Sequence, residues 1–375
     1  MSKGPGADLL SRRTFLQRSA SAAGGLAFSS AFLAACGGSN RAAKPTGRSI
    51  RISNWPLYIN PETPGDFERA TGIRVQYTED INEYFARISE PLRRGQGIER
   101  DIIVLSDWMA ARLIDLNYVV SLDDSLFPNR SNLEDSLRQV SYDPGRRFSM
   151  PWLSGMAGIG YNPKKTGREL NSVSDLFDPR FKGQVTMVTE MRDTVGLVML
   201  GEGRDPAFAS ATDVRAAIAK IKQYRESGHI RAFTGNDYAE DLAAGNIAAA
   251  IAWSGDIQGL AADNPDLRWI APKEGAMFFS DNMMIPKTSE RARDAMAWID
   301  YVYEPRVSAK IVSSAPFISP VKGAHTELQK IAPELAASPL VNPPAELRAR
   351  LHSFRELEDL EDREFNRIFQ DAVGA

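Results

Sequence analysis

Aromatic and acidic side chains stand together at several points where the chain is expected to enter or leave a β-strand. The segments are Asn54 to Tyr58, Ser106 to Trp108, Glu190 to Asp193, Trp253 to Asp256 and Phe278 to Asp281. Ring faces attract ammonium groups and pack on methylenes, while carboxylates accept charge-assisted hydrogen bonds. Together in one cleft, such side chains would suit an elongated organic cation.

The two kinds of side chain would contribute differently to binding. Each cation–ring contact is worth about 0.5 to 2 kcal/mol, and burial of four methylenes adds roughly 3 kcal/mol. The rings would therefore supply much of the affinity. The carboxylates would set selectivity, because a buried carboxylate that faces a methyl group instead of an ammonium stays unpaired.

Each of these side chains also has a purely structural interpretation. A tryptophan beside a strand is often a packing residue, and a carboxylate after a strand often caps a helix, as Asp107 could. Glu190 and Asp193 could also form the acid–base pair of an exported hydrolase. However, acids three residues apart near a helix start interact well with its positive end, and no activated nucleophile accompanies them.

Alternating strand and helix patterns are expected to position these segments. Strands are predicted near 50–52, 73–77, 101–105, 184–188 and 248–253, and helices near 64–71, 81–93, 108–116, 194–200, 213–226 and 238–244. Ligands of open α/β sheets bind outside the carboxyl ends of the strands. Because one sheet with this many units would be unusually large, we expect two α/β lobes.

Other motifs carry little chemistry. Ser154 to Tyr161 is glycine-rich and strand-like, typical of a segment that crosses between lobes or forms a hinge. Its spacing is not GxGxxG, and Asn162-Pro163 opposes a helix directly after it, so a phosphate-binding loop is disfavoured. The acidic run Glu356 to Glu364 is interpreted as the solvated face of a helix.

Composition excludes several classes of function. The 375 residues carry a formal charge of −3, without the basic stripe that a nucleic-acid partner requires. Cys36 is the only cysteine, so no intramolecular disulfide is possible. The three histidines are widely separated and have no zinc-site spacing. We therefore expect no metal site and no cofactor.

The N-terminus reads as an export signal. Arg12 and Arg13 precede a stretch of small and apolar residues from Ala20 to Ala35, which is too short for a good membrane span. Residues 1–35 resemble a twin-arginine signal that ends in a lipoprotein cleavage box, with Cys36 at the lipid-attachment position. Residues 36–47 are expected to be a flexible tether. The alternative is an amphipathic helix with an incidental cysteine.

Several longer sequence segments resemble those of a known family. They are Ser53 to Tyr58, Thr71 to Val75, Asp101 to Ser106, Met150 to Trp152 with Gly158 to Asn162, and Pro272 to Gly275 with Ile285-Pro286. At these residues the chain resembles the polyamine-binding proteins of bacterial spermidine/putrescine ABC importers. The resemblance extends over nearly all of the mature region.

The resemblance implies an α/β, two-lobed periplasmic-binding-protein fold of type II with the ligand in the interlobe cleft. Lobe 1 would comprise 48–154 and 280–325, and lobe 2 would comprise 155–279 and 326–372. The protein would be an extracytoplasmic, lipid-anchored monomer without catalysis. It would deliver putrescine or spermidine to the transmembrane subunits of an ABC permease, which work with a cytoplasmic ATPase.

The resemblance also implies ligand positions. Ring faces would come from Trp55, Tyr58, Trp108, Trp253, Phe279 and Phe317. Glu190 and Asp193 would hold one terminal ammonium, Asp281 another amine, and Ser106 a lesser polar contact; Asp107 and Asp256 complete the predicted site. Pro56, Asp107 and the two phenylalanines depart from the family pattern, so a diamine, a triamine and a different cation, such as a thiamine-like one, stay open.

Overall fold

The computed structural model describes residues 47–80, 83–261 and 263–374, which belong to one compact unit. The predicted export signal, the lipid-attachment box with Cys36 and almost all of the predicted tether lie outside these residues. None of the helices in the described ranges combines the length and the apolar character that a membrane span requires.

Lobe 1 begins with alternating strands and helices that form a parallel sheet. Its elements are β1 (Ser49–Asn54), α2 (Thr63–Thr71), β2 (Arg74–Glu79), α3 (Glu83–Arg93), β3 (Ile102–Ser106) and α4 (Asp107–Asp115). β1 pairs in parallel with both β2 and β3. Apolar side chains project from both faces of this sheet. Ile50 and Ile52 belong to one core cluster, whereas Ile103 and Leu105 belong to another with Met109. The strands and helices predicted here are confirmed to within a few residues.

Lobe 2 repeats the same alternation around its own core. Its elements are α5 (Pro163–Thr166), β7 (Val185–Val188), α6 (Met191–Gly201), α7 (Ala211–Glu226), β8 (Ile230–Thr234), α8 (Tyr238–Ala244), β9 (Ala249–Trp253), α9 (Ser254–Ala261) and β10 (Arg268–Ile270). β7 lies between β8 and β9, parallel to both. α6 begins three residues earlier than predicted, which puts Asp193 in its first turn.

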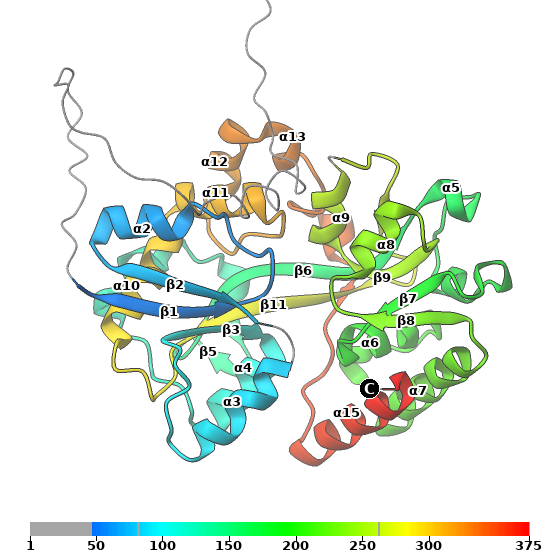
Figure 1. Ribbon diagram of the computed structural model, residues 1–375, viewed down its shortest axis with the longest axis horizontal. Coiled ribbons are helices and arrows are strands. Elements are labelled where there is room, and N and C mark those ends of the chain that lie inside the picture. The colour runs from blue at the N-terminus through cyan, green and yellow to red at the C-terminus, as the bar shows by residue number, and fades with distance from the viewer. Residues whose placement is uncertain (1–46, 81–82, 262, 375) are drawn as a thin grey trace, which may run out of the picture. The chain divides into compact units, whose positions relative to one another are not determined.

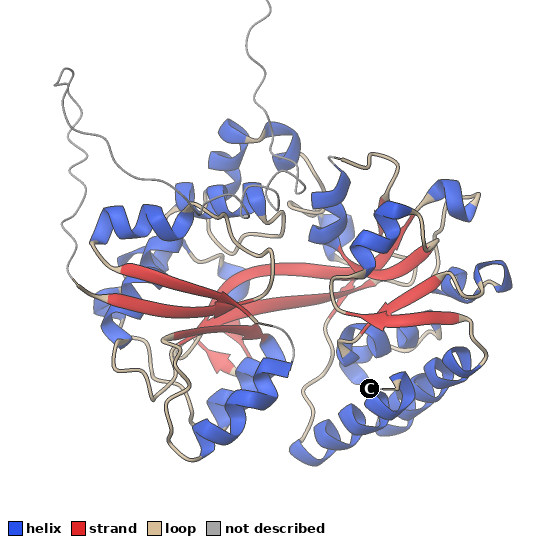
Figure 2. Cartoon of the chain, in the orientation of Figure 1, coloured by secondary structure: helices blue, strands red, loops and turns tan. Residues whose placement is uncertain are grey.

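Two long strands join the lobes. β6 (Met150–Tyr161) and β11 (Ala276–Met284) pair with each other in antiparallel fashion. β11 also pairs with β3 of lobe 1, and β6 pairs with β9 of lobe 2, so one hydrogen-bonded sheet runs in the order β2-β1-β3-β11-β6-β9-β7-β8 (Figures 1 and 2). The glycine-rich segment predicted to cross between lobes is the second part of β6.

The C-terminal segment from α10 onward packs on both lobes. The remaining α-helices and strands are α10 (Ala292–Val302), α11 (Pro305–Ser314), α12 (Ala324–Ile331), α13 (Pro333–Ala336), α14 (Ala345–Arg348), β12 (Leu351–His352) and α15 (Asp359–Val373), with a short hairpin of β4 (Gln139–Val140) and β5 (Asp143–Pro144) earlier in the chain. Leu328, Ala336 and Val341 pack in the core of lobe 1, although lobe 2 was expected from residue 326. Phe365 and Phe369 of α15 pack in lobe 2.

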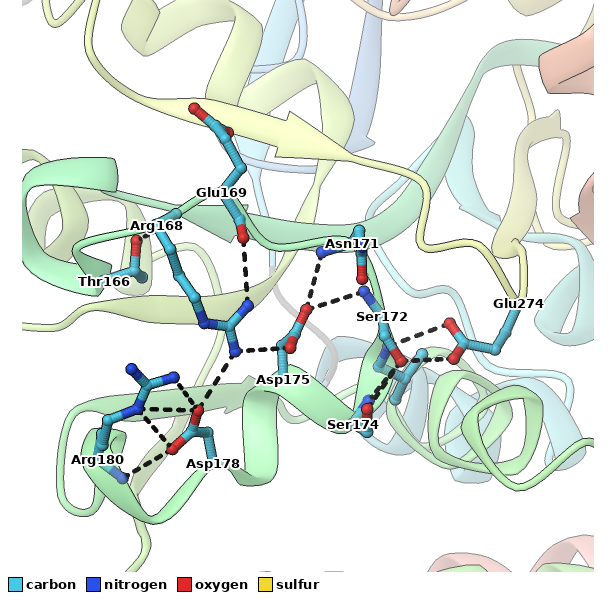
Figure 3. A network of polar contacts seen from close by, with 11 residues as sticks. Thr166, Arg168, Glu169, Asn171, Ser172, Ser174, Asp175, Asp178, Arg180 and Glu274 are labelled. Atoms are coloured by element: carbon cyan, nitrogen blue, oxygen red, sulfur yellow. Dashed lines mark hydrogen bonds and ion pairs between the residues drawn. The ribbon is translucent and has the colours of Figure 1, made fainter.

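A polar network holds the loop that leads into β7 of lobe 2 (Figure 3). The Asp175 carboxylate accepts hydrogen bonds from the backbone N–H groups of Asn171 and Ser172 and from Arg168, at 2.7 to 3.0 Å. The Ser172 hydroxyl donates to Glu274 at 2.5 Å, which ties this loop to the start of β11. Burial raises the pKa of Asp175, but these donors outweigh it and hold the pKa below its usual value.

Candidate functional site

One cavity of about 580 Å³ lies where the two lobes meet, and every side chain predicted for the binding site lines it. The lining includes Trp55, Tyr58, Ser106, Asp107, Trp108, Glu190, Asp193, Trp253, Asp256, Phe279, Asp281 and Phe317. Most of them follow the carboxyl ends of β1, β3, β7 and β9. Phe279 and Asp281 differ, because they lie in the middle of β11 rather than at its start.

Lobe 1 presents a buried carboxylate that a tryptophan orients. The Trp55 indole N–H donates to Asp281 Oδ1 at 3.0 Å. Asp281 is registered opposite Ser106 in the β3–β11 ladder, so the backbone fixes its position. Trp55 engages one of its two oxygens.

Lobe 2 presents a second carboxylate with the same arrangement. The Trp253 indole N–H donates to Asp193 Oδ2 at 2.8 Å. The Tyr238 hydroxyl accepts from the Trp253 backbone N–H at 2.8 Å and donates to Asp256 Oδ2 at 2.7 Å. Asn236 also donates to Asp256. These bonds fix the rings and carboxylates of lobe 2 before any ligand arrives.

Aromatic rings form one wall of the cavity. Tyr58 and Phe317 meet edge to face with their ring centres 4.8 Å apart, and Phe279 lies 6.4 Å from Phe317. Glycines make room for them: a Cβ at Gly155 would lie 2.4 Å from the Phe279 ring, and one at Gly255 would lie 2.3 Å from Phe317. Gly155 therefore leaves room for the packing of these rings.

Two of the predicted acids also have structural roles. Glu190 caps α6, because its side chain accepts from the Arg192 backbone N–H at 3.2 Å. Asp107 is the first residue of α4, and its carboxylate accepts from the Trp108 backbone N–H at 2.8 Å. Both side chains line the cavity as well.

The carboxylates destabilise one another's charge. Burial, followed by repulsion from Glu190, raises the pKa of Asp193 to about 8, and Asp281 contributes to this repulsion across the cleft. Burial raises the pKa of Asp281 to about 7, although Tyr58 and Trp55 act in the opposite direction. Burial also raises the pKa values of Glu190 and Asp107. A cationic ligand would relieve this unfavourable state.

Sequence reasoning missed a cation in this acidic cleft. Arg192 lines the cavity between Glu190 and Asp193, and its guanidinium lies 4.0 Å from the centre of the Trp108 ring. Its Nη2 donates to Asp362 at 2.8 Å. The interpretation of residues 356–364 as a solvated helix face is therefore wrong for Asp362, which is buried and paired. Arg192 is visible in the sequence, but its partner is 170 positions away.

The segment before α15 was also missed. Ser353, Phe354, Arg355 and Glu356 line the cavity, and Glu356 accepts from the Ser141 hydroxyl at 2.6 Å. Arg355 forms a bidentate pair with Glu361 at 2.8 and 2.9 Å. No local pattern in the sequence marks this segment, since its position depends on where β12 and α15 attach.

Comparison with known proteins identifies the class of protein that has this cleft. A family model for bacterial extracellular solute-binding proteins matches residues 65–342. The chain belongs to this family. The assignment accounts for a cavity between two lobes that is lined by preoriented polar groups, and it is a family of binding proteins rather than of enzymes.

Characterised solute-binding proteins resemble the chain over most of its length. The putrescine-binding periplasmic protein PotF of Escherichia coli is 29% identical over 335 residues, which cover 84% of this chain and 89% of PotF. The putrescine-binding protein SpuD of Pseudomonas aeruginosa is 29% identical over 331 residues. The Escherichia coli spermidine/putrescine-binding periplasmic protein is 24% identical over 302 residues.

Solved structures confirm the two-lobed periplasmic-binding-protein fold. A chain from Listeria monocytogenes, provisionally assigned to spermidine/putrescine ABC transport, superposes with a TM-score of 0.79 at 26% identity and covers 87% of this chain and 98% of that one. PotD from Streptococcus pneumoniae superposes with a TM-score of 0.73 at 23% identity over the same shares.

Proposed function

We propose that this solute-binding protein captures a small polyamine, such as putrescine or spermidine, without catalysis and delivers it to the permease of an ABC importer. One observation carries the proposal. Asp193 and Asp281 come from opposite lobes, and a tryptophan N–H holds each of them in the same ring-lined cavity. Two fixed acceptors for ammonium groups, with apolar rings beside them, suit a slender cation with charges at both ends.

The names of the relatives support the same ligand class. PotF and SpuD are putrescine-binding proteins, and both match more than four fifths of this chain. The contacts of Glu190 also favour binding over acid–base catalysis, because its carboxylate caps α6 through the Arg192 N–H. We infer that the protein acts as a monomer that closes its lobes around the ligand about β6 and β11.

Calorimetry with a matched set of four-carbon ligands tests the proposal. We expect the whole chain, carrying Cys36→Ser to remove the free thiol, to bind putrescine and spermidine at micromolar concentrations or below. Butylamine, with one ammonium, should bind at least tenfold more weakly, and 1,4-butanediol should not bind. An absence of heat and of any thermal shift at millimolar putrescine and spermidine would exclude a polyamine. The same thermal-shift screen with thiamine-like and other amines would then identify a different cation.

We further propose that a lipid on Cys36 anchors the protein at the outer face of the cell membrane. The proposal rests on the sequence, in which Leu33 to Gly37 has the form of a lipoprotein box. Metabolic labelling with a fatty-acid analogue should mark the wild-type protein and leave the Cys36→Ser variant unmarked. Equal labelling of the two proteins would contradict the anchor.

A further inference from the structure

Asp362 on α15 is shared by arginines from both lobes. Its Oδ1 accepts from Nη2 of Arg192 on α6 at 2.8 Å, within lobe 2. Its Oδ2 lies 3.7 Å from Nη1 of Arg112 on α4, which belongs to lobe 1. One carboxylate therefore neutralises a cation on each side of the cleft.

Arg192 makes a second contact across the cleft. Its guanidinium carbon lies 4.0 Å from the centre of the Trp108 ring, a distance at which a cation–ring interaction is favourable. Trp108 and Arg112 are four residues apart on α4, so they project from the same face of that helix. Trp108, Arg112, Arg192 and Asp362 together form what we call the clasp, in which one side of α4 meets α6 and α15.

The clasp also determines where a permanent positive charge lies in an acidic site. Arginine stays protonated in proteins, and Arg192 acts to lower the pKa values of both Glu190 and Asp107. Asp362 and Arg192 are each less than a tenth exposed, so solvent screens their attraction weakly. By binding the guanidinium, Asp362 helps to hold it over the Trp108 ring.

We propose that Asp362 is a positioning residue for ligand capture. It does not contact the ligand; it stabilises the closed cleft by screening Arg112 from Arg192, and it keeps Arg192 from occupying the place of the ligand's ammonium. Without its charge, the two guanidinium groups that approach it would lose a shared counter-charge and repel each other more strongly. This inference rests on the proposed function, because it concerns the closed state of the same cleft.

The Asp362→Asn variant tests the proposal, since it keeps an acceptor oxygen for Arg192 and Asn366 but removes the charge. In the whole chain with Cys36→Ser, we expect the Kd values of putrescine and of spermidine to rise about tenfold each, mainly through faster dissociation. The ratio of the two Kd values should stay unchanged because Asp362 touches neither ligand. Asp371→Asn, on the exposed part of the same helix, is the matched control and should bind as the parent does.

A second substitution separates positioning from a merely structural role. Adding Arg112→Gln to Asp362→Asn removes one of the two facing cations, and it should recover at least threefold of the lost affinity. If Asp362 only held α15 on lobe 2, the added substitution would not restore binding. Arg112→Gln alone should weaken binding by a smaller factor in the same direction, and this single variant tests the clasp even if Asp362→Asn folds poorly.

The outcomes are distinguishable. Normal binding by Asp362→Asn, or a double variant no better than Asp362→Asn, would overturn the clasp while leaving polyamine binding intact. Failure of the parent protein itself to bind any amine would instead remove the proposed function on which the clasp rests.

Discussion

An Asp281→Asn variant is expected to bind putrescine about a hundredfold more weakly than the parent protein. Truncating one partner of a buried charge pair costs about 2 to 5 kcal/mol, largely because the remaining ammonium is left buried and unpaired. Asp281 is buried, and Trp55 holds one of its oxygens, so the variant leaves an uncharged amide in place of the carboxylate. Titration calorimetry with both proteins at the same pH measures the difference.

Trp55→Phe provides a graded comparison for this result. It keeps most of the ring but removes the N–H that orients Asp281, so its affinity should fall by about tenfold, the equivalent of one hydrogen bond to a charged group. The order of affinity should be parent, then Trp55→Phe, then Asp281→Asn. If Asp281→Asn binds within threefold of the parent, Asp281 does not hold an ammonium.

Binding should release protons and strengthen as the pH rises from about 6 to about 9. Asp281 and Asp193, whose pKa values are raised to about 7 and about 8, are both partly protonated at neutral pH in the free protein. An ammonium ligand favours their charged forms and lowers both pKa values, so roughly one proton leaves on binding at pH 7. Above about pH 10 the ligand itself loses charge, and affinity should decline again.

Calorimetry at pH 7 in buffers of different ionisation enthalpy counts the released protons. Asp281→Asn should reduce their number, and a binding enthalpy independent of the buffer would contradict the expectation. The stability of the free protein should change in the opposite direction. Since the folded-state pKa values of these acids are raised, their contribution is fully present below the unfolded pKa near 4 and is lost as the pH rises through 7 and 8. A saturating polyamine should restore it.

Local signals predicted much of the fold and the lining of the cleft. Strands such as β3 and β9 are recognisable as short apolar runs. The rule that ligands bind beyond the carboxyl ends of strands correctly predicted that Trp55, Trp108 and Trp253 line one cavity. The family resemblance added Phe317, which lies in a loop, and gave a ring-face role to Phe279, which lies inside a long crossing strand. Ligand contact by these residues stays a prediction, and the calorimetry above tests it through Trp55 and Asp281.

The parts that were missed depend on contacts between distant positions. Arg192 was not predicted as part of the site, because its neighbours Glu190 and Asp193 carry the negative charge expected there. Asp362 lies in an acidic run typical of a solvated helix, and the packing of both α15 and α6 on α7 brings it to Arg192. Charge pairs 170 residues apart leave no periodicity or spacing that a single sequence can show.

The pairing of β6 with β11 restricts how the two halves of the molecule can move. The two strands pair from Met277 to Met283 with one irregularity between Ser280 and Asn282, so neither half can swing as freely as it could on two unpaired connections. The remaining freedom is a bend and twist of a paired ribbon, which samples few orientations. The two lobes should therefore lose little orientational entropy when they close on a solute. A small molecule that makes only a few favourable contacts can then still be bound.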